Sequence, residues 1–192
     1  MTREELAKKK ILFCDLDGTL IKTYSGNTFP QGVWDVELKL DIWSKIVDLF
    51  PNLQALYIVT NQGGIGHGYV NEERFQNKMR WILSSLEDWF QLKVNFVPIT
   101  NGYACTSNDV DHPCKKPNPG MLRKAVESCV FCEKVDIEGL GVQMPSLTKP
   151  KKEDMVMLGD ASGREGDFSD SDKMTAENFG IDYIDVRDLL KL

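Results

Sequence analysis

Apolar residues follow two alternating patterns along this chain of 192 residues. Short, nearly continuous apolar runs are typical of buried strands, whereas apolar residues recurring every three or four positions are typical of amphipathic helices. The runs predict strands at 11–16, 55–59, 94–99, 155–158 and 181–184. The helical spacing predicts helices at 34–50, 71–90, 117–128 and 171–179. Because strands that alternate with helices form βαβ units, we predict an α/β protein with a mostly parallel, Rossmann-like sheet flanked by helices.

Polar residues gather where three of the predicted strands end. Asp15-Leu16-Asp17 closes the first strand, Thr60-Asn61-Gln62 follows the second, and Gly159-Asp160 follows the fourth. In a parallel sheet the carboxyl ends of the strands lie at one edge, and ligands bind there. We therefore expect the three segments to form one site.

Length and composition are those of one globular domain. Hydrophobic residues make up 42% of the chain and charged residues 27%, which excludes disordered and low-complexity classes. We expect a single domain over 1–192, with a small metal-binding or irregular insertion around 100–152 and irregular structure at 133–152. No apolar run approaches the roughly 20 residues of a membrane helix, and no secretion signal is evident. We therefore expect a cytoplasmic protein with no membrane partner.

The charge is unevenly distributed. The chain carries a net charge of −6, which argues against a nucleic-acid-binding surface that is basic all over. Residues 115–152 are net +4, whereas residues 153–192 are net −7. The acidic part suits either clustered carboxylates that hold a divalent cation or a solvated acidic face, and charge alone does not decide between them.

The strongest chemical signal is Asp15-Leu16-Asp17-Gly18-Thr19-Leu20, directly after an apolar run. Two carboxylates one residue apart can reach a single centre if the chain turns, and Gly18 permits that turn. One carboxylate can attack phosphorus, and the other can protonate the leaving oxygen and later activate water. Carboxylates this close need an offsetting cation, and Mg²⁺ suits oxygen ligands and phosphate. An exposed acidic turn is the alternative interpretation.

Four motifs, in order, resemble the haloacid dehalogenase superfamily of phosphohydrolases. Asp15 matches the family nucleophile and Asp17 the general acid and base. Thr60 matches the residue that binds the phosphoryl group, Lys116 the lysine that clamps phosphate and nucleophile, and Asp160 the acidic metal ligand. The resemblance implies a Mg²⁺-dependent phosphatase that works through an aspartyl-phosphate, with the metal held by Asp15, Asp160 and the Asp17 carbonyl.

Residues 60–68 and 116–121 resemble the subgroup of this superfamily that has no large cap domain. That subgroup includes histidinol-phosphate phosphatases, heptose-bisphosphate phosphatases and the 3′-phosphatase of polynucleotide kinase. Residues 15–30, 159–164 and 167–181 are most similar to the last of these, which implies removal of 3′-phosphate from polynucleotide ends. A small-molecule phosphatase of the histidinol-phosphate or heptose-bisphosphate type is the alternative, and a non-catalytic phosphate-binding module is a third reading.

Further residues follow from these interpretations. The predicted substrate-binding set is Gly18, Thr60, Asn61, Lys116 and Arg164, and secondary candidates to hold metal-bound water or orient Lys116 are Asp167, Asp170 and Asp172. Basic candidates for nucleic-acid phosphates are Lys22, Lys115, Arg164 and the run at 149–152. Aromatic candidates for stacking on a base are Tyr24, Phe29 and Tyr103. No Gly-x-x-x-x-Gly-Lys-Ser/Thr run occurs, so we expect no kinase domain in this chain.

The five cysteines are Cys14, Cys105, Cys114, Cys129 and Cys132. An odd number without a secretion signal favours thiols or metal ligands over disulfides, and Cys14 is expected in the core. Small-molecule phosphatases of the resembling subgroup carry a Cys-x-His, Cys-x-Cys zinc loop before the Lys-Pro motif. Here three ligands of that loop remain, Cys105, His112 and Cys114, to be completed by Asp109, Asp111 or the Cys129-x-x-Cys132 pair. The alternative is a relic loop with ordinary thiols.

Overall fold

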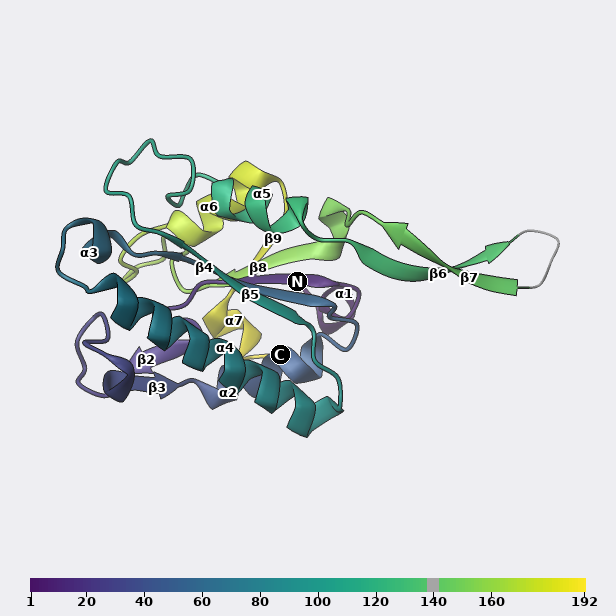
Figure 1. The fold of residues 1–192 in the computed structure, drawn as a ribbon, viewed down its shortest axis with the longest axis horizontal. Helices are drawn as coiled ribbons and strands as arrows, with labels where there is room; N and C mark the ends of the chain where they lie inside the picture. The colour runs from purple at the N-terminus through teal and green to yellow at the C-terminus, as the bar shows by residue number, and fades with distance from the viewer. Residues whose placement is uncertain (138–141) are drawn as a thin grey trace.

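The computed structural model describes the backbone of residues 1–137 and 142–192, and the side chains outside 132–146. Its centre is a five-stranded sheet in the order β5-β4-β1-β8-β9, with every pairing parallel (Figure 1). The strands are β1 (Ile11–Cys14), β4 (Ala55–Asn61), β5 (Ile99–Cys105), β8 (Met155–Gly159) and β9 (Asp182–Asp185). The predicted α/β class is confirmed. The chain passes from β1 to β4 on one side and later to β8 on the other, so the strand order switches beside β1, where α/β sheets bind ligands.

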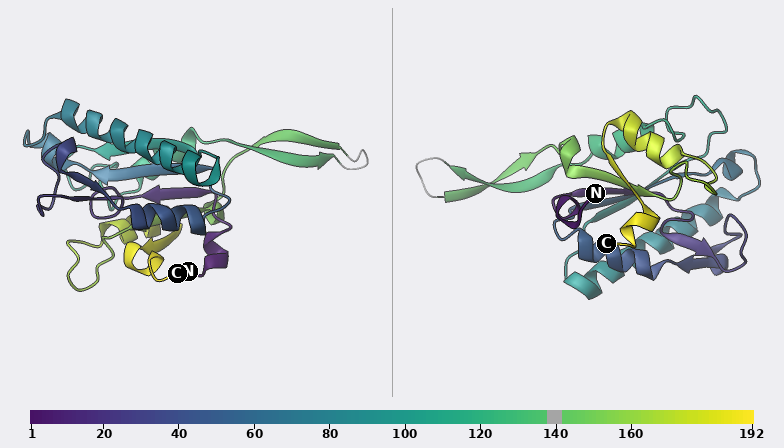
Figure 2. Two further views of the ribbon diagram at one scale, coloured as in Figure 1. Left: turned by 90° about the horizontal axis from the view of Figure 1, so that it is seen from below. Right: turned by 180° about the vertical axis from the view of Figure 1, so that it is seen from behind.

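Helices cover both faces of the sheet (Figure 2). One layer holds α1 (Arg3–Leu6), α2 (Leu40–Leu49), α4 (Glu72–Val94) and α7 (Val186–Leu189), and the other holds α5 (Gly120–Glu127) and α6 (Ser171–Phe179). Alternate residues of β1 join the two layers: Leu12 and Cys14 lie in one buried cluster, Ile11 and Phe13 in the other. Because both faces are covered, the central strands are apolar throughout, and their runs were readable from the sequence.

The third predicted strand is displaced. Residues 94–99 were expected to form it, but α4 continues to Val94 and ends at Asn95, which adopts a left-handed conformation with φ 53°. The strand β5 begins only at Ile99 and pairs with β4 through Cys105. It lies at the edge of the sheet and is only partly buried, so it lacks the apolar run that marks the central strands.

The start of the predicted helix at 34–50 is also different. A short 3₁₀ helix, η1 (Val33–Asp35), leads into β3 (Val36–Leu38), which pairs antiparallel with β2 (Ile21–Thr23), and the α-helix starts at Leu40. Asp35 explains the interruption. Its buried carboxylate accepts hydrogen bonds from the backbone N–H groups of Ser25 and Gln31 and from the Ser25 hydroxyl, and these fix a loop instead of a helical turn.

The expectation of irregular structure at 133–152 is wrong. The strands β6 (Phe131–Ile137) and β7 (Val142–Thr148) pair antiparallel and project from the body as a two-stranded ribbon, and η2 (Lys152–Asp154) precedes β8 (Figure 1). The residues of this segment mix charged and apolar types without strict alternation, so backbone pairing was not visible in the pattern. The part of that expectation at 138–141 lies outside the described residues.

No large cap domain covers the carboxyl ends of the strands in the described part of the chain. The insertions near this edge are the β2–β3 ribbon and the short helix α3 (Gly63–Gly66) after β4. Within the same residues, no helix is long and apolar enough to span a bilayer.

Candidate active site

The loop after β1 brings two aspartates and a glycine to the switch point. Asp15 continues the sheet for one residue, since its N–H donates to the Leu158 carbonyl at 2.9 Å. Gly18 then turns the chain with a φ of 89°, and a Cβ at this position would lie 2.1 Å from Asp160 Oδ2. Only glycine therefore allows the carboxylate at the end of β8 to approach the backbone of this loop.

A buried lysine connects the loop after β1 with the first turn of α6. Lys116 Nζ donates to Asp15 Oδ1 at 2.5 Å and to Asp172 Oδ1 at 2.6 Å, and all three side chains are buried. Asn61 holds the lysine backbone from β4: its Oδ1 accepts from Lys116 N–H at 2.9 Å, and its Nδ2 donates to the Lys116 carbonyl at 3.1 Å. Lys116 is thus positioned through both its backbone and its ammonium group.

Three carboxylates surround one point of this site. Oxygen atoms of Asp15, Asp160 and Asp172 lie within 4.8 Å of one another, a donor set of the kind that Mg²⁺ prefers. Asp160 accepts a hydrogen bond from Thr19 Oγ1 at 3.3 Å, and Asp172 Oδ2 accepts one from the Ala161 N–H at 3.1 Å. The residues present therefore fit a divalent cation. The set predicted from the sequence was Asp15, Asp160 and the Asp17 carbonyl, with Asp172 only as a secondary residue.

The pKa shifts of the buried groups indicate that this site favours a bound cation. Burial, together with the charges of Asp172 and Asp17, raises the pKa of Asp15 well above its ordinary value, although Lys116 opposes the shift. Burial and the Asp172 charge also raise the pKa of Asp160. Burial disfavours the charged form of Lys116, but Asp15 and Asp172 outweigh it and raise the lysine pKa. Lys116 donates to Asp15 and Asp172, and a cation beside the three carboxylates would further stabilise their ionised forms.

Asp17 is held by Gln62, which the sequence analysis named only as part of a strand-end segment, and is approached by Lys78, which it did not name. Gln62 Nε2 donates to Asp17 Oδ2 at 2.8 Å and to Thr60 Oγ1 at 2.9 Å, which links the second aspartate to the predicted phosphate-binding hydroxyl. Lys78 Nζ lies 3.9 Å from Asp17 Oδ1, and that oxygen is buried without a hydrogen-bond partner in the described residues. One signal could have revealed Lys78: helical spacing from Phe75 puts a lysine on the buried face of α4.

A cavity of about 720 Å³ contains most of the predicted site. Its lining includes the following residues from the sequence analysis: Asp15, Asp17, Gly18, Thr60, Asn61, Lys116, Asp160, Asp167, Asp170 and Asp172. Arg164 is not among the lining residues. Its guanidinium forms an ion pair with Asp188 on α7, so the structure does not bring this predicted substrate-binding residue to the cavity. Arg187 lines the cavity instead, paired with Asp167 at 2.9 Å.

The polynucleotide kinase 3 phosphatase family model matches residues 10–187. The chain belongs to this family. A bifunctional polynucleotide phosphatase/kinase of Schizosaccharomyces pombe is 31% identical over 176 residues, which are 91% of this chain and 36% of the relative, so the chain spans about a third of that protein's length. A probable D-glycero-D-manno-heptose-1,7-bisphosphate 7-phosphatase of Thermoplasma volcanium is 30% identical over 165 residues, 83% of this chain and 91% of the relative.

A solved structure has the same fold as this member of the polynucleotide kinase 3 phosphatase family. The D,D-heptose 1,7-bisphosphate phosphatase from B. bronchiseptica, crystallised with magnesium and phosphate, superposes with a TM-score of 0.55 over 95% of this chain and 96% of that one, at 16% identity. With these relatives, the chain is a phosphatase of the haloacid dehalogenase type.

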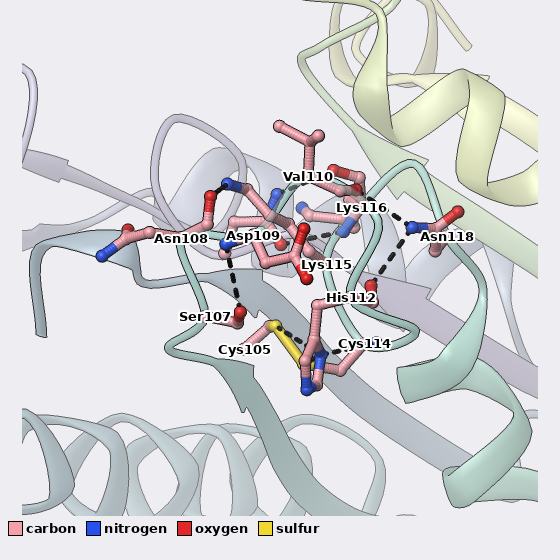
Figure 3. Close-up of a disulfide and its surroundings, with 11 residues drawn as sticks. Cys105, Ser107, Asn108, Asp109, Val110, His112, Cys114, Lys115, Lys116 and Asn118 are labelled. Atoms are coloured by element: carbon pink, nitrogen blue, oxygen red, sulfur yellow. Dashed lines mark hydrogen bonds between the residues drawn. A yellow bond between two sulfur atoms is a disulfide. The ribbon is translucent and has the colours of Figure 1, made fainter. Parts of the chain in front are cut away.

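The predicted zinc residues of this family member lie together but are engaged differently (Figure 3). Cys105 and Cys114 have Cα atoms 5.5 Å apart and form a disulfide, and His112 Nδ1 accepts the Cys114 N–H at 3.2 Å. Disulfide sulfurs are not thiolates and do not coordinate zinc in the usual way. The expectation of free thiols or metal ligands is therefore wrong for this pair, because the return of the loop beside the end of β5 brings the two sulfurs within bonding distance.

Among the residues whose side chains are described, the remaining candidates do not complete a zinc site. The Asp109 carboxylate accepts the Asp111 N–H at 3.0 Å, and neither side chain joins the Cys105, His112 and Cys114 group. Cys129 is a free, buried thiol, Cys14 lies in the core as expected, and the side chain of Cys132 lies outside the described residues.

Proposed function

We propose that this chain is a Mg²⁺-dependent phosphomonoesterase that removes the 3′-phosphate from polynucleotide ends through an aspartyl-phosphate intermediate. The observation that carries the chemistry is the buried ion-pair network in which Lys116 contacts both Asp15 and Asp172 at the switch point of the sheet. The match of the polynucleotide kinase 3 phosphatase family over residues 10–187 supports the choice of substrate.

In the first step, an Asp15 carboxylate oxygen attacks phosphorus as the bond from phosphorus to the leaving 3′-oxygen breaks. Asp17 transfers its proton to that oxygen, which leaves as the hydroxyl of the polynucleotide. Lys116 and the Thr60 hydroxyl are positioned to stabilise the negative charge that develops on the transferring group. In the second step, Asp17 takes a proton from a water molecule, and the water oxygen bonds to phosphorus as the bond from phosphorus to the Asp15 oxygen breaks. Inorganic phosphate leaves, and the Asp15 carboxylate is regenerated.

Asp15, Asp160 and the Asp17 carbonyl would hold the cation, and Asp172 would orient Lys116. When bound, Mg²⁺ polarises the phosphoryl group as a Lewis acid and offsets the carboxylate charges. The contacts support this division of roles: Asp15 is the aspartate paired with Lys116, whereas Asp17 is the one held by Gln62 and approached by Lys78. A nucleophile beside Lys116, which would clamp the phosphate, and an acid held by separate residues suit an in-line displacement.

The open architecture supports a polymeric substrate. No large cap closes the cavity in the described part of the chain, so a strand end can enter without a lid being displaced. The Schizosaccharomyces pombe relative is a polynucleotide phosphatase/kinase by name, and 91% of this chain matches it.

The test is phosphate release, with Mg²⁺, from one oligonucleotide carrying either a 3′- or a 5′-phosphate, beside heptose 1,7-bisphosphate at the same concentration. We expect kcat/KM for the 3′-phosphate to exceed the other two by at least about 100-fold. Equal rates on the two ends, or release only from the sugar phosphate, would refute the proposed substrate.

A heptose bisphosphate is the second candidate, because the Thermoplasma volcanium relative is 30% identical and the chain covers 91% of it. This alternative keeps Asp15 and Asp17 in the same roles and changes only the leaving group. Preference for the sugar bisphosphate in the same assay would favour it.

A further inference from the structure

A second cavity, of about 480 Å³, adjoins the catalytic one, and we call it the side pocket. It lies between the turn after β4, which contains α3, and the first two turns of α4. Phe29 and Asn61 line both cavities, so the two cavities are adjacent. Of the residues that line the side pocket, Asn61, Gln62 and Lys78 were described with the catalytic site, and Phe29 was predicted from the sequence as a candidate for stacking on a base.

The two cavities differ sharply in charge. Six aspartates line the catalytic cavity, whereas the described residues that line the side pocket include no carboxylate. The side pocket instead carries two cations from one face of α4, Arg74 and Lys78, which lie four residues apart and therefore on neighbouring turns. Arg74 forms no ion pair with a carboxylate in the described part of the chain. An anionic group that extends from the catalytic centre is thus attracted toward α4 and repelled from the acidic wall.

The position of Asp17 gives the direction of the leaving group. In the proposed function Asp17 protonates the leaving oxygen, so the rest of the substrate must extend from the Asp17 side of the phosphorus. Lys78, at the inner end of the side pocket, is the cation nearest to that side, with Nζ 3.9 Å from Asp17 Oδ1. The side pocket is therefore where the leaving group continues.

The outer rim of the side pocket is aromatic. The rings of His67 and Tyr69 stack with centroids 5.4 Å apart and an interplanar angle of 26°, and Tyr69 is 84% exposed. Phe29 stands at the border of the two cavities and is 53% exposed. Exposed rings beside cations are the combination by which proteins hold single-stranded nucleic acid, since any base can stack on them and the cations contact its phosphates.

We propose that the side pocket binds the terminal nucleotide of the substrate. Arg74 contacts the phosphodiester group that precedes the 3′-phosphate, and the buried Lys78 lies one turn further along α4. The exposed ring of Tyr69 stacks on a base. This inference rests on the proposed function, which it deepens by naming the residues that distinguish a polynucleotide end from a lone phosphate ester. None of them belongs to the four catalytic motifs.

The test compares two substrates that differ by one phosphodiester: thymidine 3′-monophosphate and the 3′-phosphorylated dithymidylate. The wild-type protein should prefer the dinucleotide by about tenfold in kcat/KM, as one charge-assisted phosphate contact allows. Arg74→Gln should bring the kcat/KM values of the two substrates to within about twofold. For the dinucleotide, the slope of log(kcat/KM) against log[salt] should become shallower by about one unit in this variant. Arg74→Lys should retain part of the preference.

Arg80→Gln is the matched control. Arg80 is an exposed arginine of the same helix, its guanidinium contacts Asn77, and it does not line the side pocket. This variant should keep the wild-type preference.

The outcomes separate the two proposals. An Arg74→Gln protein that hydrolyses both substrates and keeps the full dinucleotide preference overturns the side-pocket assignment and leaves the proposed function standing. A wild-type protein that hydrolyses neither nucleotide but releases phosphate from heptose 1,7-bisphosphate overturns the proposed function, and the side-pocket assignment with it.

Discussion

The catalytic cavity and the side pocket share a border but are built by different means. In the catalytic cavity, strand ends hold Asp15, Lys116 and Asp172 in a buried network with hydrogen bonds at both ends of the lysine. In the side pocket, one helix face and a glycine-rich turn present Arg74 and Tyr69 to solvent. The buried network suits chemistry that must be pre-organised, and the exposed one suits recognition of a substrate that varies.

Two buried lysines make the same contrast. Lys116 donates to two carboxylates at hydrogen-bond distance, whereas Lys78 approaches only Asp17, at 3.9 Å, and lies 5.3 Å from the centre of the Phe75 ring. The first is fixed between its partners. The second lines the side pocket and lies beside Asp17 of the catalytic cavity, so it connects the general acid with the place where the leaving group continues.

The largest effect should come from the nucleophile. Asp15→Asn removes the attacking carboxylate but keeps the size of the side chain, so kcat should fall by at least about 10³-fold on every phosphate ester. The measurement is phosphate release together with a thermal unfolding curve to confirm that the protein folds. Asp88→Asn, at an exposed position of α4, is the control. Substantial residual turnover in Asp15→Asn would refute covalent catalysis by this residue.

The metal site should show the next effect. Removing divalent cations with EDTA should abolish turnover, and adding Mg²⁺ should restore it. Asp160→Asn should raise the Mg²⁺ concentration needed for half-maximal activity by about 10- to 100-fold, since a carboxylate ligand is lost. Activity that survives chelation in the wild-type protein would contradict the assignment of Asp15 and Asp160 as ligands of a divalent cation.

The disulfide closes a loop that packs against the turn beside the side pocket. A Cβ on Gly66 would lie 2.2 Å from the Thr106 carbonyl, so the loop closed by Cys105 and Cys114 packs tightly against the turn that bounds the side pocket. Because the two cysteines are nine positions apart in sequence, reduction should lower the free energy of unfolding by about 2–3 kcal/mol. Denaturant unfolding of Cys105→Ser and of the wild-type protein with and without dithiothreitol measures this, and identical curves would contradict it.

Replacing Lys78 should have a smaller effect than the changes at Asp15 and Asp160, mainly on kcat rather than on KM. Lys78→Gln removes the charge beside Asp17, so kcat should fall by about tenfold, with a smaller change in KM, on the mononucleotide and the dinucleotide alike. Lys78→Arg should restore part of kcat, and Lys93→Gln, on the exposed end of the same helix, should have no effect. A change confined to KM would instead place Lys78 in substrate binding alone.

The outer wall of the catalytic cavity should give the smallest effect. A hydrogen bond from Arg187 holds the pKa of Asp167 well below its ordinary value. A lowered carboxyl pKa stabilises the fold above the unfolded pKa near 3.9, and that contribution is lost as the pH falls further. Because Arg187 is 40% exposed, Arg187→Met should cost only about 1 kcal/mol at pH 7, and the difference from wild type should shrink below about pH 4. A difference that is independent of pH would contradict this origin.

The sequence predicted the catalytic cavity well and the side pocket hardly at all. Strand ends bring Asp15, Thr60 and Asp160 together by topology, and apolar runs reveal those ends. Arg74 and Tyr69 stand in an amphipathic helix and a turn whose patterns reveal only their secondary structure. The disulfide was unpredictable for a similar reason, since the approach of Cys105 and Cys114 depends on the path of the loop between them.

The central claim is that Asp15 receives phosphate from a polynucleotide 3′ end. The most direct measurement is acid quenching of a reaction with an oligonucleotide labelled at its 3′-phosphate, followed by peptide mapping of the protein. We predict a hydroxylamine-sensitive label on the peptide that contains Asp15, formed and lost at rates consistent with kcat, and no label in Asp15→Asn. Turnover of the labelled strand without any protein-bound phosphate, or with the label on another residue, would contradict the account.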